Sequence, residues 1–380
     1  MHILPIASGK GGVGKSLVAA NLAIALAQAG KRVVLVDLDL GGSNLHLVLG
    51  IHSVPAGIGN VIQQSSVQLN DVLMPTDYPN LLFIPGDAEI PGIANLNNKQ
   101  KLMLLRRMKQ LDADYVIIDL GAGTSFNTLD FFLSSSHGII VTTPTPTAIV
   151  NAYLFLKNAV FRIITNNVKR KSPGGEYLER VKKEGTQLQR MNITTIMQQL
   201  QLHDPDSYSK VSQALTRFQP RMILNMLEDP KDAQKANRLR RSCSQYLDTE
   251  LEHLGIIYRD DLQDVALSSR LPIISYKPNS VLSQALYRIA DKVLQSTEDD
   301  EDLMDIQTIE ESYANAGIEA EIDFQAKIDY IEDLLHAGAL STGDLIETIK
   351  NQQLEITQLK KQNMLYKTKL VKAVQQGYKI

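Results

Sequence analysis

The first 145 residues alternate between short, continuous apolar runs and longer segments with helical spacing. Residues 16–30 are rich in Ala and Leu and end in Gly30, which predicts a helix closed by a glycine. Continuous apolar runs are typical of parallel strands buried on both faces. They lie at 2–7, 32–39, 81–86, 114–121 and 138–144. Strands that alternate with helices predict an α/β fold with a mostly parallel sheet flanked by helices.

The pattern changes between about 166 and 215, where the chain is polar, rich in Lys and Gln and helically spaced. Strand-like runs resume at 220–227 and 253–260, so we expect a helical insertion within one α/β domain covering residues 1–296. Residues 297–305 include five consecutive acidic residues and are typical of a solvated linker. The remainder, 306–380, has no strand-like run and predicts a helical C-terminal region.

Composition narrows the classes of protein that fit. The 39 basic and 42 acidic residues nearly balance, so no overall charge favours a polyanionic partner. The single cysteine, Cys243, excludes a disulfide framework and a metal cluster held only by cysteines of one chain. Residues 1–7 lack a charged leader, and no uninterrupted apolar run approaches 18 residues. We therefore expect a cytoplasmic protein without a membrane-spanning helix.

Residues 9–16, GKGGVGKS, fit the phosphate-loop pattern G-x-x-x-x-G-K-[ST] in full, between a predicted strand and a predicted helix. The glycines allow backbone N–H groups to turn towards phosphate oxygens, and the helix beginning near Lys15 adds its positive end. Lys15 is expected to bind the β- and γ-phosphates, and the Ser16 hydroxyl to ligate Mg²⁺. The sequence thus predicts a site for a nucleoside triphosphate with Mg²⁺.

Three acidic residues follow buried strands and support this site. Asp37 and Asp39 lie two positions apart at the carboxyl end of one predicted strand, so they share a face. Asp119 lies at the end of another. Ligands of open α/β sheets bind at the carboxyl ends of the strands. These carboxylates are therefore expected near the phosphate loop.

The motifs resemble those of the MinD/ParA family of P-loop ATPases, a SIMIBI-type fold. A lysine directly after the first loop glycine is similar to the family's deviant Walker A motif. The segments VDLDLGGSNL and DYVIIDLGAG resemble its switch I and its Walker B with switch II, and residues 121–153 look closest to the FlhG/FleN branch. The resemblance covers residues 1 to about 295, apart from the insertion.

The resemblance implies roles for individual residues. Lys10 matches the signature lysine that reaches the phosphates bound by a partner subunit, and Asp39 matches the acid that orients the attacking water. Asp37 and Asp119 are implied near Mg²⁺, with Ser16 as a ligand. Asn225 falls where the family reads adenine; Tyr258, where the family usually has proline, and Asp260 lie in the loop opposite. The implied nucleotide-binding set is Gly9, Lys10, Gly11, Gly12, Val13, Gly14, Lys15, Ser16, Leu17, Asn225, Tyr258 and Asp260.

The position of Lys10 agrees with that implied role. A loop that already holds Lys15 does not need a second ammonium on the same phosphates. A lysine within the turn cannot easily fold back into its own cradle, but it can project towards a second subunit. An additional cation at a phosphoryl-transfer transition state is worth about 10³–10⁵ in rate.

The C-terminal region has an apolar heptad pattern. The positions are Leu345, Ile349, Gln352, Ile356, Leu359, Asn363, Tyr366, Leu370 and Ala373. A short coiled coil with one polar Asn fits this pattern, and packing on the body of the protein is an alternative. Residues 350–380 hold seven lysines and one acid, so weak peripheral contact with the inner face of the membrane is a third interpretation.

Together these features predict an ATP-dependent switch that dimerises, hydrolyses ATP slowly under the control of an unknown protein activator or cargo, and positions a cellular machine. One alternative is a ParA-like partitioning ATPase that binds DNA non-specifically, for which the basic segment 235–242 is the candidate surface. Another is a P-loop amidase or ligase of small-molecule metabolism, which no acceptor-site motif supports.

Overall fold

The computed structural model describes residues 1–40, 42–64, 66–86, 96–183, 193–298 and 306–336, together with six separate positions between 343 and 364. The chain forms two compact units, Met1–Phe324 and Gln325–Ile380. The first unit therefore extends beyond the expected boundary at residue 296. Most of the expected linker, 299–305, lies outside the described residues.

The first unit is built on one eight-stranded sheet with the strand order β3-β4-β2-β5-β1-β6-β7-β8. Every neighbouring pair is parallel except β3 with β4, which is antiparallel. The strands are β1 (His2–Ala7), β2 (Val33–Leu38), β3 (Met74–Pro75), β4 (Leu81–Ile84), β5 (Tyr115–Leu120), β6 (Ile139–Thr142), β7 (Arg221–Leu227) and β8 (Glu252–Tyr258). The predicted parallel sheet is confirmed, and β3 is a strand that the apolar pattern did not predict.

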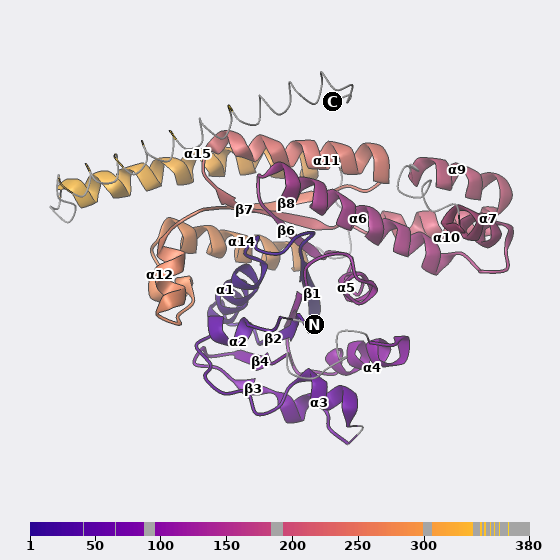
Figure 1. Ribbon diagram of the computed structural model, residues 1–380, viewed down its shortest axis with the longest axis horizontal. Helices are drawn as coiled ribbons and strands as arrows, with labels where there is room; N and C mark the ends of the chain where they lie inside the picture. Colours follow the sequence, from indigo (N-terminus) through magenta and orange to yellow (C-terminus); the bar gives the residue numbers. More distant parts are fainter. Residues whose placement is uncertain are drawn as a thin grey trace. The chain divides into compact units, whose positions relative to one another are not determined.

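Alternate residues of the central strands β1, β2, β5 and β6 pack into different cores, which explains why these strand sequences are apolar throughout. In β2, Val33 and Leu35 belong to one buried cluster, while Val34 and Val36 belong to the other. The first cluster contains α1 (Lys15–Gln28), α13 (Ile273–Tyr276) and α14 (Val281–Glu298). The second contains residues of α4 (Asn98–Met108), α5 (Phe126–Phe132), α6 (Pro146–Asn167) and α11 (Gln234–Leu247). Figure 1 shows these two groups of helices on opposite sides of the strands.

Shorter elements connect these strands and helices. They are α2 (Leu45–Val48), α3 (Ile58–Gln63), α12 (Leu262–Ser268) and the 3₁₀ turns η1 (Leu69–Val72) and η2 (Pro230–Ala233). The α2 turn is the next element after β2, and the loop between them contains Asp39. The α12 helix follows β8 and lies beside a cavity described below.

The predicted insertion contains α7 (Pro173–Lys183), α9 (Ile193–His203) and α10 (Pro205–Thr216), between α6 and β7. Ile196, Leu200 and Val211 are fully buried in the same cluster as α6 and α11. Asp204 accepts hydrogen bonds from the backbone N–H groups of Ser207 and Gly174, which joins the start of α10 to α7. The insertion therefore shares the core of the α/β domain.

The long helix α15 (Ile306–His336) begins within the first unit. Ile309, Tyr313, Ala316 and Ala320 are buried at alternating spacings of four and three residues, the spacing of a helix packed along one face. The Tyr313 hydroxyl donates to the Leu251 carbonyl at 2.8 Å. The start of the expected C-terminal region is thus part of the α/β unit. All nine heptad positions between 345 and 373 lie outside the described residues.

Helix α6 bears on the expectation that the chain has no membrane-spanning helix. Among the described residues it is the one helix that is long and apolar enough by composition to cross a membrane, with 44% of its apolar window buried. Its sequence contains Asn151, Lys157 and Asn158, so it has no uninterrupted apolar run. Phe155, Leu156 and Ala159 are fully buried in the core, which accounts for its apolar composition.

Candidate functional site

The phosphate loop joins β1 to α1, as its sequence predicts. Gly12 and Gly14 have φ values of 78° and 82°, in the left-handed region that favours glycine. A Cβ on Gly9 would lie 2.2 Å from the carbonyl oxygen of Asn151, so this residue allows the loop to pass close to α6. The loop ends where α1 begins, which directs the positive end of the helix towards the loop.

Lys15 and Asp119 form a buried ion pair beside this loop. The Lys15 Nζ atom is 2.5 Å from Asp119 Oδ1 and 3.3 Å from the Ser16 hydroxyl. Both charged side chains are almost fully buried. Burial raises the pKa of the Asp119 carboxyl, and the positive charge of Lys15 opposes that shift. The structure thus brings together the three predicted residues Lys15, Ser16 and Asp119.

Asp37 lies next to Asp119 in the sheet, since the two are paired across β2 and β5. Its Oδ2 accepts a hydrogen bond from the Ser43 hydroxyl at 2.6 Å, and its Oδ1 accepts one from the backbone N–H of Asp39 at 3.0 Å. Burial and the neighbouring charge of Asp119 raise the pKa of Asp37 to about 6. Asp37 therefore holds the loop that follows β2 against the end of the sheet.

Asp39 lies in that loop and is partly buried. A Cβ built on Gly121 would be 3.1 Å from Asp39 Oδ1, so the carboxylate packs closely against the loop after β5. The backbone N–H of Gly123 in the same loop donates to the Ser8 carbonyl at 3.0 Å. The loops after β1, β2 and β5 consequently meet at one place, where the sequence predicted the reactive end of the nucleotide.

The residues fit a bound Mg²⁺. Ser16, Asp37 and Asp119 supply hydroxyl and carboxylate oxygens, the ligands that Mg²⁺ prefers. Two neighbouring carboxylates whose pKa values are both raised are an environment that a cation stabilises. When bound with ATP, Mg²⁺ would neutralise charge on the β- and γ-phosphates.

Lys10 differs from Lys15 in its surroundings. Its side chain is exposed, whereas that of Lys15 is buried. It makes no hydrogen bond or ion pair with the residues that the structure describes. The loop therefore directs one lysine inward and leaves the other on the protein surface.

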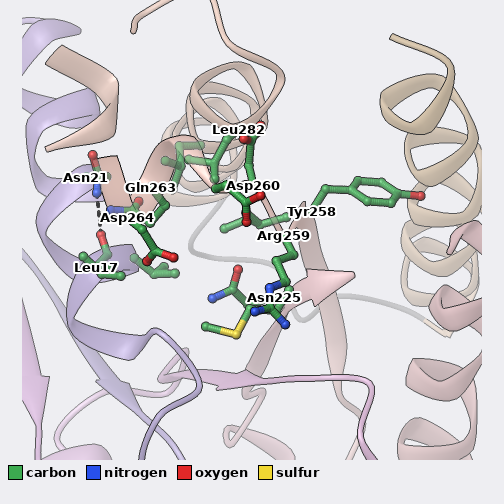
Figure 2. A pocket seen from close by; sticks show the side chains of 14 residues that line it. Leu17, Asn21, Asn225, Tyr258, Arg259, Asp260, Gln263, Asp264 and Leu282 are labelled. Carbon is green, nitrogen blue, oxygen red and sulfur yellow. Dashed lines mark hydrogen bonds between the residues drawn. The ribbon is translucent and has the colours of Figure 1, made fainter. Parts of the chain in front are cut away.

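A cavity of about 220 Å³ lies between the start of α1 and the carboxyl ends of β7 and β8. Figure 2 shows Asn225 and Asp264 directed towards this cavity from different elements. Asn225 also donates a hydrogen bond from Nδ2 to the Val13 carbonyl at 2.9 Å, so it contacts the phosphate loop directly. Leu17 and Asp260 line the cavity too. Its place beside the phosphate loop suits the base of a nucleotide.

A bulge in β7 directs Asn225 towards this cavity. The pairing of β7 with β8 shifts register between Leu224 and Leu227, and Met226 has a φ of 58°. Such a bulge redirects a side chain at a strand end. Nothing in the residue pattern of 220–227 signalled it, and Met226, which also lines the cavity, was not among the predicted residues.

Tyr258 was predicted to bind the nucleotide, but its side chain is not directed into the cavity. Figure 2 shows its ring pointing away from the cavity. The hydroxyl donates to the Ala320 carbonyl in α15 at 2.8 Å, and the side chain is buried. Tyr258 is one of the residues that line the cavity, but its ring does not point into it. Asp260, by contrast, faces the cavity and accepts a hydrogen bond from the Leu262 N–H at 3.0 Å.

Comparisons with known proteins agree with this architecture. A family model described as "ParA: NUBPL iron-transfer P-loop NTPase" matches residues 1–165. The antiactivator FleN of Pseudomonas aeruginosa is 24% identical over 296 residues, which cover 77% of this chain and 86% of FleN. The flagellum site-determining protein YlxH of Helicobacter pylori is 34% identical over 158 residues, 40% of this chain. The septum site-determining protein MinD of Synechocystis is 36% identical over 153 residues, also 40%.

The matched region spans about half the length of YlxH and MinD, 52% and 56%. Among solved structures, a ParA family ATPase from Chlorobium tepidum has a TM-score of 0.53 at 20% identity, covering 76% of this chain and 97% of that one. A chain of the MinC:MinD cell division protein complex from Aquifex aeolicus has a TM-score of 0.52 at 18% identity, covering 78% of this chain and 96% of that one. At these identities the structures establish the fold. The phosphate loop, its acidic residues and the sequence matches make residues 1–165 similar to the MinD/ParA family of P-loop ATPases, and the solved structures show the same fold.

Proposed function

We propose that this protein is an ATP-dependent switch, which dimerises when it binds Mg-ATP, hydrolyses ATP to ADP slowly and positions a cellular machine or cargo. YlxH and MinD, by their names, determine a flagellum site and a septum site, which supports this class of function. The observation that carries the proposal is the contrast between buried Lys15 and exposed Lys10 in one phosphate loop.

In the proposed cycle, different residues of this chain bind the phosphates, orient the water and hold the base. The loop glycines and the start of α1 bind the phosphates, with Lys15 exchanging Asp119 for phosphate oxygens as the nucleotide enters. Asp39, at the meeting point of the three loops, orients the attacking water. Asn225 and Asp260 hold the base. Lys10 extends to the phosphates of a second subunit and stabilises charge there as hydrolysis proceeds.

Substitutions of the two lysines test the proposal. Lys15→Ala should abolish ATP binding, measured by calorimetry. Lys10→Ala should bind ATP but fail to form the ATP-dependent dimer, or lose about 10³-fold or more in hydrolysis rate, measured by light scattering and phosphate release. Lys99→Ala, which removes an exposed lysine of α4, is the matched control. Wild-type dimerisation and turnover by Lys10→Ala would exclude a role in the partner's site.

A second candidate function is ParA-like binding of DNA. Arg238 and Arg241 are both exposed on α11, while Arg240 lies within 4 Å of Glu250 and Glu310. This candidate predicts binding that requires ATP, ignores base sequence and weakens steeply as salt is raised. Sedimentation of wild type and Asp39→Ala with DNA and with anionic liposomes, in parallel, separates it from the membrane interpretation of the lysine-rich residues 350–380.

A further inference from the structure

Helix α5 connects the loop after β5 to two charged side chains of other helices. The loop, Gly121–Thr124, leads into the Ser125 cap, whose hydroxyl accepts a hydrogen bond from the Thr128 N–H at 3.1 Å. One turn later comes Asp130. This short helix lies between α4 and α6 (Figure 1). Asp130 is therefore joined by one short helix to the loop that packs against Asp39.

The Asp130 carboxylate binds one cation from each neighbouring helix. Lys101 of α4 donates to Oδ2. Arg162 of α6 donates from Nε to Oδ1 at 2.7 Å and from Nη2 to Oδ2 at 3.0 Å. Two parallel N–H···O bonds fix an arginine and a carboxylate in direction as well as in distance. The three side chains thus hold α5 in position from both sides.

Burial makes these contacts stronger than an ordinary surface ion pair. The side chains of Lys101, Asp130 and Arg162 are 7%, 15% and 24% exposed. Pairs screened from water retain more of their attraction than exposed pairs do. The Arg162 guanidinium also lies 5.2 Å from the centre of the Phe126 ring, at the start of α5. The network therefore reaches both ends of this short helix.

The loop that α5 supports has little freedom at the site. Gly121 packs against the Asp39 carboxylate, and the Gly123 N–H binds the Ser8 carbonyl next to the phosphate loop. The Asp130 network lies outside the phosphate loop and the base cavity. A change at Asp130 can therefore alter the geometry around Asp39 without removing a group that holds the nucleotide.

We infer that Asp130 is a positioning residue for ATP hydrolysis, which acts through α5 to keep the loop after β5 aligned with Asp39. The inference rests on the proposed function. A substitution of Asp130 should therefore affect turnover and not ATP binding, because misplacing reacting groups by about 1 Å can cost up to 100-fold in rate. Asp130→Asn should lower kcat about tenfold or more and leave the Kd for ATP within about twofold.

The matched control is Glu252→Gln. Glu252 pairs with Arg221 Nε at 2.7 Å, and the two side chains are 14% and 1% exposed. Both residues are at the amino ends of their strands, opposite the nucleotide site. This variant also removes one carboxylate charge from a buried pair, so it measures how far kcat falls when a pair away from the site loses that charge. Equal losses of kcat in the two variants would overturn the inference, as would an unchanged kcat in Asp130→Asn.

A milder variant and a second measurement keep the test decisive. If Asp130→Asn does not fold, Arg162→Lys retains the charge and loses the bidentate geometry, and its kcat should be reduced while its ATP affinity is kept. Hydrogen exchange of the amides at 121–128 should be faster in either variant than in wild type and unchanged in Glu252→Gln. If wild type does not hydrolyse ATP, the proposed function fails, while unchanged exchange at 121–128 refutes the role of Asp130 separately.

Discussion

The raised pKa of Asp37 predicts a particular dependence of stability on pH. The pKa of this carboxyl is about 6 in the folded protein, against 3.8 for the unperturbed group. Because the folded-state pKa is the higher one, the stabilising contribution is complete below about pH 3.8 and is lost as pH rises through 6. A shift of about two units at about 1.4 kcal/mol per unit makes the ionised carboxylate destabilising by about 3 kcal/mol.

Asp37→Asn cannot ionise, so it should not show this loss. Urea unfolding of nucleotide-free wild type and Asp37→Asn should therefore give free energies of unfolding that diverge with pH. About 1.4 kcal/mol of the difference should develop between pH 5 and pH 8, with wild type losing stability relative to the variant. Asp119, whose pKa burial also raises, is present in both proteins. Parallel curves for the two proteins over this range would refute the assignment of the shift to Asp37.

Three further substitutions, one of them paired with a control, test the geometry of the site. Gly14→Ala should lose about 1–2 kcal/mol of stability and most ATP affinity, because its φ is 82° and its Cβ would lie 2.3 Å from Asn225 Nδ2. The control Gly11→Ala has open space around its Cβ and should lose little stability. Asn225→Ala should weaken ATP binding by about 1 kcal/mol in calorimetry, since it removes the hydrogen bond to Val13; unchanged affinity would argue against a role in the site. Tyr258→Phe should lower the unfolding free energy by about 1 kcal/mol while ATP affinity stays constant, and a larger effect on affinity than on stability would contradict the outward direction of the ring.

Local patterns predicted the elements of the sheet because burial on both faces requires continuous apolar sequence. The runs at 2–7, 114–121 and 138–144 correspond to β1, β5 and β6. The antiparallel strand β3 was not predicted, because it has only two residues, Met74 and Pro75. The strand order also required the structure, since β1 pairs with β5 and β6 across more than 100 residues.

The sequence did not predict where the first compact unit ends. The acidic run at 298–302 suggests a linker, and composition after it suggests a separate helical region. The structure instead groups residues up to Phe324 with the α/β domain. Packing of α15 depends on contacts such as Tyr313 with Leu251 and Lys292 with Glu319. A helical pattern shows which face is apolar, but it does not identify the surface that covers that face.

By itself, the sequence determined the phosphate loop, its two lysines and the acidic residues at the strand ends, because these depend on short spacings that local geometry enforces. Tertiary structure decided that Lys15 turns inward to Asp119, that a bulge directs Asn225 to the cavity beside the phosphate loop, and that Tyr258 turns away from that cavity. It also brought Lys101, Asp130 and Arg162 together from three helices. Contacts of this kind join residues far apart in the chain, so only the packing of helices on the sheet specifies them.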